Sequence, residues 1–145
     1  MRMRLIGLFT VFWIIGSPFV GVAADGPSFR VIAHPSTKVQ HVGRDFLADA
    51  FLKRTTRWAD GARISPVDQR ADADVRERFS ERVLRRSVSA VRSYWQQMIF
   101  GGRDVPPPEL ETDEAVIRYV SSRAGAVGYV SSTAQLDNVR VLEVR

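Results

Sequence analysis

The apolar residues of the chain change their spacing several times, from that of strands to that of helices. Short runs rich in β-branched and aromatic residues predict strands, and apolar residues three or four positions apart predict amphipathic helices. We expect strands at 29–34, 64–67, 126–130 and 139–144, and helices at 44–53, at 75–86, from 88 to the glycines at 101–102, and after Thr112. Because strands alternate with helices in one short chain, the pattern indicates an α/β fold with a mixed or parallel sheet.

The residues at the ends of these segments support the predicted helix boundaries. Gly43 stands at an N-cap position, and Ser87 and Thr112 can each accept a hydrogen bond from a free amide in the first turn. Gly125 is expected to end the last helix. The predicted inward stripes of the last two helices are Val88, Val91, Trp95, Met98 and Ile99 in one, and Val116, Tyr119 and Val120 in the other.

The start of the chain differs from the rest. A short basic stretch precedes an almost uncharged apolar run over residues 5–22 that ends in small residues. This order is typical of a secretory signal peptide. A membrane anchor that is not cleaved is the alternative, but Gly16 and Pro18 interrupt the run. We therefore expect a cleaved signal peptide at 1–24, a mature domain at 25–145, and localisation in the periplasm.

Composition narrows the classes of function. A length of 145 residues allows one domain of ordinary size, and the absence of cysteine excludes disulfides, zinc ribbons and thiol nucleophiles. The formal net charge of +5 falls to +3 once Arg2 and Arg4 of the signal peptide are removed. The basic residues are almost all arginine and form no block interleaved with aromatic residues, so we expect no nucleic-acid partner.

Residue patterns for catalysis and cofactor binding are also missing. The chain has no G-x-S-x-G elbow, P-loop or G-x-G-x-x-G, and its only histidines are His34 and His41. His41 with Asp45 four positions later is a weak metal pair, and the carboxylates near Asp74 are more simply explained as partners of a helix dipole. We therefore predict a protein that is not an enzyme, with no cofactor and no metal.

Several short segments between residues 29 and 144 form a spaced set. They are Val31–Ser36 (VIAHPS), Phe51–Trp58 (FLKRTTRW), Ile64–Gln69 (ISPVDQ) with Arg78–Phe79, Tyr94–Trp95, Phe100–Arg103 (FGGR), Pro107–Pro108 and Gly125–Val130 (GAVGYV). Together they resemble the periplasmic substrate-binding proteins of phosphate ABC transporters, and especially a group of short bacterial relatives. The first, second and last segments are similar to the family's v-v-x-N-P-x, F-x-G-K-x-x-x-W and G-A-I-G-Y patterns, with His34 in the place of the asparagine.

The resemblance implies a type-2 periplasmic-binding-protein fold with a mixed sheet flanked by helices. Full-length members have two lobes that close on an anion, and the segments found here match the second lobe. We therefore expect a single lobe. The resemblance also implies a small, phosphate-like oxyanion as ligand. An ABC permease, another envelope protein or a second copy of the chain would be its partner.

One loop combines the resemblance with a physical argument for anion binding. The loop at 69–74 runs into the start of a predicted helix, where free amides and the helix dipole favour an anion. Arg70 can add a bidentate contact, and Arg70-Ala71-Asp72 resembles the family's R-x-D with a shift of one residue. In the family, an aspartate of this kind selects a protonated oxyanion. The candidate ligand residues are Ser36, Thr37, Arg70, Asp72, Asp74, Val75 and Arg76.

Two functions remain open at this stage. The leading one is a solute-binding-protein-like domain that binds an oxyanion at the loop from Arg70 to Arg76. The alternative is a single-lobe envelope interaction or accessory module that has lost ligand binding, because the Ser-Gly-Thr that follows R-x-D in the family is absent. Under that alternative Arg70 is a solvated loop residue, and Ser36 and Thr37 cap a turn.

Overall fold

The computed structural model describes residues 28–145, so the predicted signal peptide at 1–24 lies outside the described residues. A five-stranded sheet has the order β2-β7-β1-β6-β3. The strands are β1 (Phe29–Ala33), β2 (His41–Val42), β3 (Ser65–Pro66), β6 (Ala126–Ser131) and β7 (Arg140–Val144). Strand β1 is antiparallel to β6 and β7, whereas β2 is parallel to β7 and β3 to β6. The predicted mixed sheet is confirmed.

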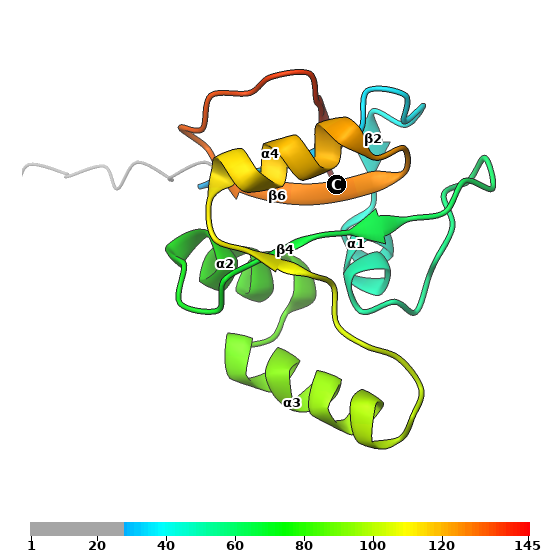
Figure 1. Ribbon diagram of the computed structural model, residues 1–145, viewed down its shortest axis with the longest axis vertical. Coiled ribbons are helices and arrows are strands. Elements are labelled where there is room, and N and C mark those ends of the chain that lie inside the picture. The colour runs from blue at the N-terminus through cyan, green and yellow to red at the C-terminus, as the bar shows by residue number, and fades with distance from the viewer. Residues whose placement is uncertain (1–27) are drawn as a thin grey trace, which may run out of the picture.

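Helices cover both faces of this sheet. Helix α4 (Asp113–Ser122) lies over one face, and Figure 1 shows it in front of β6. The other face is covered by α1 (Arg44–Phe51), α2 (Asp74–Phe79) and the π-helical turn η1 (Ser80–Leu84), with α3 (Val88–Phe100) as an outer layer below them in Figure 1. A second, two-stranded parallel sheet joins β4 (Asp68–Gln69) to β5 (Glu109–Leu110).

The period-two alternation of the central strands divides the core in two. Val31 and Tyr129 belong to the cluster packed against α1, α2 and α3, whereas Ile32 and Val130 belong to the cluster packed against α4. On the first face the rings of Phe79 and Tyr129 stack with centroids 3.8 Å apart and an interplanar angle of 5°. Alternate residues of one strand therefore hold two helix layers on one sheet.

Three predicted helix starts are confirmed. Gly43 is the N-cap residue of α1. The side chains of Ser87 and Thr112 accept hydrogen bonds at 3.2 Å from the amides of Ala90 and Ala115, the third residues of α3 and α4. These bonds satisfy amides that have no partner inside their helices.

Other predictions were wrong in detail. The helix expected at 75–86 ends as α2 at Phe79 and continues as the π-helical turn, after which Arg85 has a left-handed φ of 53°. Two pairs of adjacent residues are buried here, Phe79 with Ser80 and Val83 with Leu84. The wider π-helical turn brings both members of each pair inward, whereas the apolar stripe expected for a regular α-helix places only Phe79 and Val83 of these residues on its inner face.

The strand expected at 64–67 is divided. Ser65 and Pro66 pair with β6, but Asp68 and Gln69 turn away to pair with β5. In α3, Val91 and Trp95 are buried as expected, whereas Ile99 is 50% exposed because nothing covers that end of the helix within the described residues.

Gly128 sets the distance between β6 and α4. A Cβ at this position would lie 2.8 Å from a methyl carbon of Val116 and 2.8 Å from one of Val67. We predict that Gly128→Ala lowers the free energy of unfolding by about 1–3 kcal/mol, because overpacking forces neighbours off their rotamers. Urea denaturation followed by circular dichroism measures the change.

Gly43 provides the matched control. A Cβ there meets nothing within 4 Å, and its φ of −67° suits any residue. Gly43→Ala should cost less than Gly128→Ala, since only the N-cap preference changes. Equal losses at the two positions would contradict close packing at Gly128.

Candidate functional site

The candidate loop lies beyond the carboxyl ends of parallel strands. It leaves β4 after Gln69, whose side-chain amide donates to the carbonyl of Tyr129 at 3.0 Å, near the carboxyl end of β6. It then turns within four residues into α2. In α/β proteins ligands bind at this edge of a sheet, so the loop has the right position for a binding site.

Arg70 and Asp72 form a bidentate ion pair on this loop. The Arg70 Nε and Nη2 donate to the two carboxylate oxygens of Asp72, each at 2.5 Å, and Nη1 lies 3.4 Å from a carboxylate oxygen of Glu111. Hydrogen bonding to Arg70 lowers the pKa of the Asp72 carboxyl to about 2, and Asp72 raises the pKa of Arg70. Both groups are therefore charged at neutral pH, and Arg70 is already partly neutralised.

The next two candidate residues, Asp74 and Val75, open α2. Its N-cap residue is Ala73, whose side chain cannot cap, and the amides of Asp74 and Val75 have no partner inside the helix. Asp74 is exposed, and Val75 is half-buried against the core. The start of α2 therefore presents amides together with one carboxylate.

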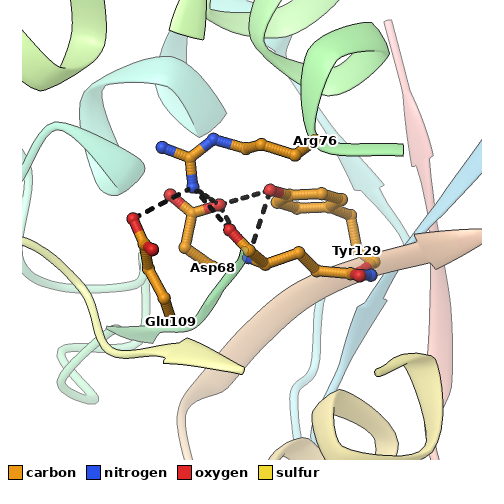
Figure 2. A network of polar contacts seen from close by, with 5 residues as sticks. Asp68, Arg76, Glu109 and Tyr129 are labelled. Atoms are coloured by element: carbon orange, nitrogen blue, oxygen red, sulfur yellow. Dashed lines mark hydrogen bonds and ion pairs between the residues drawn. The ribbon is translucent and has the colours of Figure 1, made fainter. Parts of the chain in front are cut away.

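Arg76 lies inside the molecule. It is 3% exposed, its Nη1 pairs with the Asp68 carboxylate, and the same nitrogen donates to the Gln69 carbonyl at 3.1 Å. The Tyr129 hydroxyl also donates to Asp68. Figure 2 shows the Arg76 guanidinium above the Asp68 carboxylate, with Tyr129 on one side and Glu109, 4.0 Å from Nη1, on the other. Arg76 is thus already engaged by protein groups.

This buried network extends to α4. The Gln69 amide N–H donates to Asp68 at 2.9 Å, and its side chain donates to Asp113 at 2.8 Å. Asp113, the first residue of α4, also accepts from the amide of Ser131 at 3.2 Å. Burial raises the pKa of Asp68, and Arg76, the Tyr129 hydroxyl and the Gln69 amide act in the opposite direction.

Sequence reasoning missed Asp68, Gln69, Tyr129 and Asp113 as members of one network. A signal was present: a tyrosine inside a buried strand requires a partner for its hydroxyl, and an acidic residue directly after a buried strand is a natural one. The sequence pattern does not show which acidic residue lies opposite Tyr129.

Ser36 and Thr37 lie at the other end of the sheet. They follow β1, which is antiparallel to β6, and the amide of His34 donates to the Ala126 carbonyl at the start of β6 at 3.0 Å. Ser36 and Thr37 line the same cavity as Trp58 and Arg63, which belong to the segment before β3. Figure 1 shows that segment at the right of the view and the loop before α2 at the left. The structure therefore brings Arg70, Asp72, Asp74 and Val75 together, but not Ser36 or Thr37.

The described residues form none of the metal sites that the sequence could suggest. His41 pairs with Glu143 at 2.9 Å rather than with Asp45, and no group of three or more metal-ligating side chains occurs among residues 28–145. Within the same range, no helix has the length and apolar character needed to cross a membrane.

Comparison with known proteins identifies similar folds. No protein-family model matches the chain, and no curated protein does. A Clostridium perfringens structure described as a phosphate ABC transporter substrate-binding protein with bound phosphate matches with a TM-score of 0.64 and 18% identity, covering 81% of this chain and 44% of that one. An ABC-type phosphate transport receptor from Vibrio cholerae matches with a TM-score of 0.60 and 15% identity, covering 81% of this chain and 46% of that one. PstS from Borrelia burgdorferi matches with a TM-score of 0.57 and 12% identity, covering 81% of this chain and 47% of that one.

The chain has the fold of one periplasmic-binding-protein lobe. The α/β fold predicted from the sequence is confirmed, and the structural neighbours are phosphate ABC transporter substrate-binding proteins, as the resemblance implied. The matched part of the chain, 81% of its length, covers less than half of each of these three neighbours. The candidate loop therefore belongs to a lobe that corresponds to only part of such a protein.

The ion pair on the loop gives a prediction about titration. In a carbon-detected NMR titration the Asp72 carboxyl should titrate with a pKa of about 2. In Arg70→Ala it should rise toward the ordinary value of 3.8, because the hydrogen bonds to the carboxylate are lost. The stabilisation from this pair is present above the ordinary value and is lost as the pH falls through about 2. Arg118→Ala, on α4, should leave the Asp72 titration unchanged, whereas an unchanged titration in Arg70→Ala would contradict the pairing.

The buried pair gives a prediction about stability. Arg76→Met leaves Asp68 buried without its cation, so the free energy of unfolding should fall by about 3–5 kcal/mol. Adding Asp68→Asn should recover part of this loss, since the buried charge is then removed. The control is Arg78→Met on the exposed side of α2, which should change stability by less than about 0.5 kcal/mol in urea denaturation. Equal effects at Arg76 and Arg78 would show that the ion pair does not stabilise the fold.

Proposed function

We propose that the chain is an exported solute-binding-protein-like domain that acts in the periplasm by binding rather than by catalysis. In this proposal residues 1–24 are a cleaved signal peptide and residues 25–145 form the mature lobe, which binds phosphate or a similar small oxyanion. The fold shared with phosphate-binding proteins supports it. The single observation that carries it is the exposed Arg70–Asp72 pair at the edge of the sheet where ligands bind.

The pair suits an oxyanion that still carries a proton. Asp72 takes the Nε N–H and one N–H of Nη2, and Glu111 lies 3.4 Å from Nη1, so one N–H of Nη1 and one of Nη2 can still donate to a ligand. Because Asp72 is ionised, it can accept a hydrogen bond from the O–H of hydrogen phosphate, whereas it repels sulfate, which has no proton at neutral pH. The amides of Asp74 and Val75 would add two neutral donors.

A single lobe supplies only one side of such a site. Since the matched structures are more than twice as long as the segment they share with this chain, we propose that a second surface completes the site. A second copy of the chain, an ABC permease or another envelope protein would provide it. Without that surface the ligand remains partly solvated and binds weakly.

A second candidate function is a single-lobe envelope interaction module without ligand binding. The observation that favours it is the supply of carboxylates around both arginines: Asp72 and Glu111 contact Arg70, and Asp68 and Glu109 surround Arg76. An incoming anion must then compete with charges that are already in place.

Calorimetric titration decides between the two. We expect heat of binding for phosphate at millimolar concentration and a markedly weaker response to sulfate. Arg70→Ala should weaken phosphate binding about tenfold or more, because charge-assisted hydrogen bonds are lost. Asp72→Asn should reduce the preference for phosphate over sulfate. Arg118→Ala is the matched control on α4 and should bind as the parent protein does.

Two outcomes oppose oxyanion binding at this loop. Absence of heat at millimolar phosphate with folded protein supports the interaction module instead. Binding that persists unchanged in Arg70→Ala places the anion elsewhere on the molecule.

A further inference from the structure

The described residues form a cavity at the end of the sheet opposite to the Arg70 loop. A cavity of about 350 Å³ lies between the turn after β1, the segment before β3 and the start of β6. Its main walls are Ser36, Thr37, Trp58, Arg63 and Gly125. This volume is in the range of pockets that bind small organic molecules, about 300–1,000 Å³.

Backbone hydrogen bonds fix the walls of this cavity. The Gly125 carbonyl accepts from the Trp58 indole N–H at 3.2 Å and from the Ser65 amide at 3.0 Å, and the Trp58 amide donates to Ala62 at 2.8 Å. Gly125 has a φ of 81°, and a Cβ there would lie 2.0 Å from the Arg63 carbonyl oxygen. The two segments are therefore in close contact, and the cavity exists before any ligand arrives.

Much of the cavity lining is apolar, and a buried hydroxyl belongs to one of the lining residues. Trp58, Val39, Ala59 and Ala62 contribute apolar surface. Thr37 is 6% exposed, and its buried Oγ1 has no hydrogen-bond partner in the protein. A buried hydroxyl without a partner costs free energy, so a ligand oxygen that enters as far as Thr37 Oγ1 would gain a hydrogen bond that the protein does not supply.

The rim is cationic. Lys38 and Arg63 line the cavity and are exposed. Neither belongs to any of the ion pairs found among residues 28–145. The one acidic residue of the lining, Asp60, accepts a hydrogen bond from the Ala62 amide at 3.0 Å. Two cations thus remain available to an anionic group at the entrance.

We propose that this cavity binds a small organic carboxylate with an aromatic or aliphatic body. The apolar part would pack on Trp58, and the carboxylate would lie between Lys38 and Arg63, with one oxygen within reach of the Thr37 hydroxyl. The site is separate from the loop at Arg70 and does not depend on oxyanion binding there. Two of the ligand residues predicted from the sequence, Ser36 and Thr37, line this cavity, at the end of the sheet opposite to Arg70.

Nitrogen–proton correlation NMR with benzoate as the probe tests the proposal. Benzoate at millimolar concentration should shift the Trp58 indole signal and the amide signals of Thr37 and Gly125, while the amide of Arg70 stays in place. Benzyl alcohol has the same ring without the charge and should bind at least fivefold more weakly. Phosphate should not produce these shifts, which separates this site from the one at Arg70.

Substitutions then assign the contacts. Arg63→Gln should weaken benzoate binding at least fivefold and leave benzyl alcohol unchanged, and its exposed position keeps the fold intact. Thr37→Val has nearly the same shape and should also weaken benzoate. Arg118→Gln, on α4, is the control and should bind benzoate normally. No shifts at 20-fold excess benzoate over protein, shifts located elsewhere, or equal binding of benzoate and benzyl alcohol would each overturn the proposal.

Discussion

The buried ion pair between Asp68 and Arg76 determines how the parts of this lobe fit together. Removing two charges from water is costly, and such a pair is tolerated only where further hydrogen bonds satisfy its oxygens and N–H groups. Here the Tyr129 hydroxyl, the Gln69 amide and the Gln69 carbonyl provide them. The pair joins α2 to β4, and Tyr129 joins both to β6, which lies beside the central strand β1. The loop from Arg70 to Ala73 connects two elements that this network holds, so the position of the candidate site follows from it.

The arrangement explains why two arginines six residues apart have different roles. Arg76 is buried and its charge is satisfied internally, so it contributes to the position of α2. Arg70 is on the surface, where Asp72 orients its guanidinium while part of it remains in contact with solvent. Only the second arrangement leaves donors for a ligand. The charges of the sequence alone do not distinguish the two arginines. Arg76 is buried because its helix packs through Phe79 against Tyr129, and this packing does not follow from local charge.

Much of the fold was predictable, for identifiable reasons. Runs of β-branched residues predicted β1, β6 and β7. Ser87 and Thr112 predicted the starts of α3 and α4, because capping depends only on one side chain and the amides nearest to it. The end of α2 at Phe79, which stacks on Tyr129, and the pairing of β4 with β5 involve distant partners that local spacing does not contain. The direction of β1 is equally non-local. Because β1 is antiparallel to its neighbours, Ser36 and Thr37 lie away from Arg70, although the linear order suggested one site.

The loop at Arg70 and the cavity at Thr37 differ in whether a second molecule is needed to complete a binding site. The loop at Arg70 is open, its carboxylates already compensate much of its positive charge, and its fold relatives are about twice as long as the region they share with this chain. In the proposed function, ligand affinity at this loop depends on a second surface that excludes water. The cavity at Thr37 is enclosed by three segments of the same lobe, and close packing at Gly125 holds them in place. Since a preformed pocket pays little ordering cost on binding, the proposed carboxylate site needs no partner, whereas the proposed oxyanion site does.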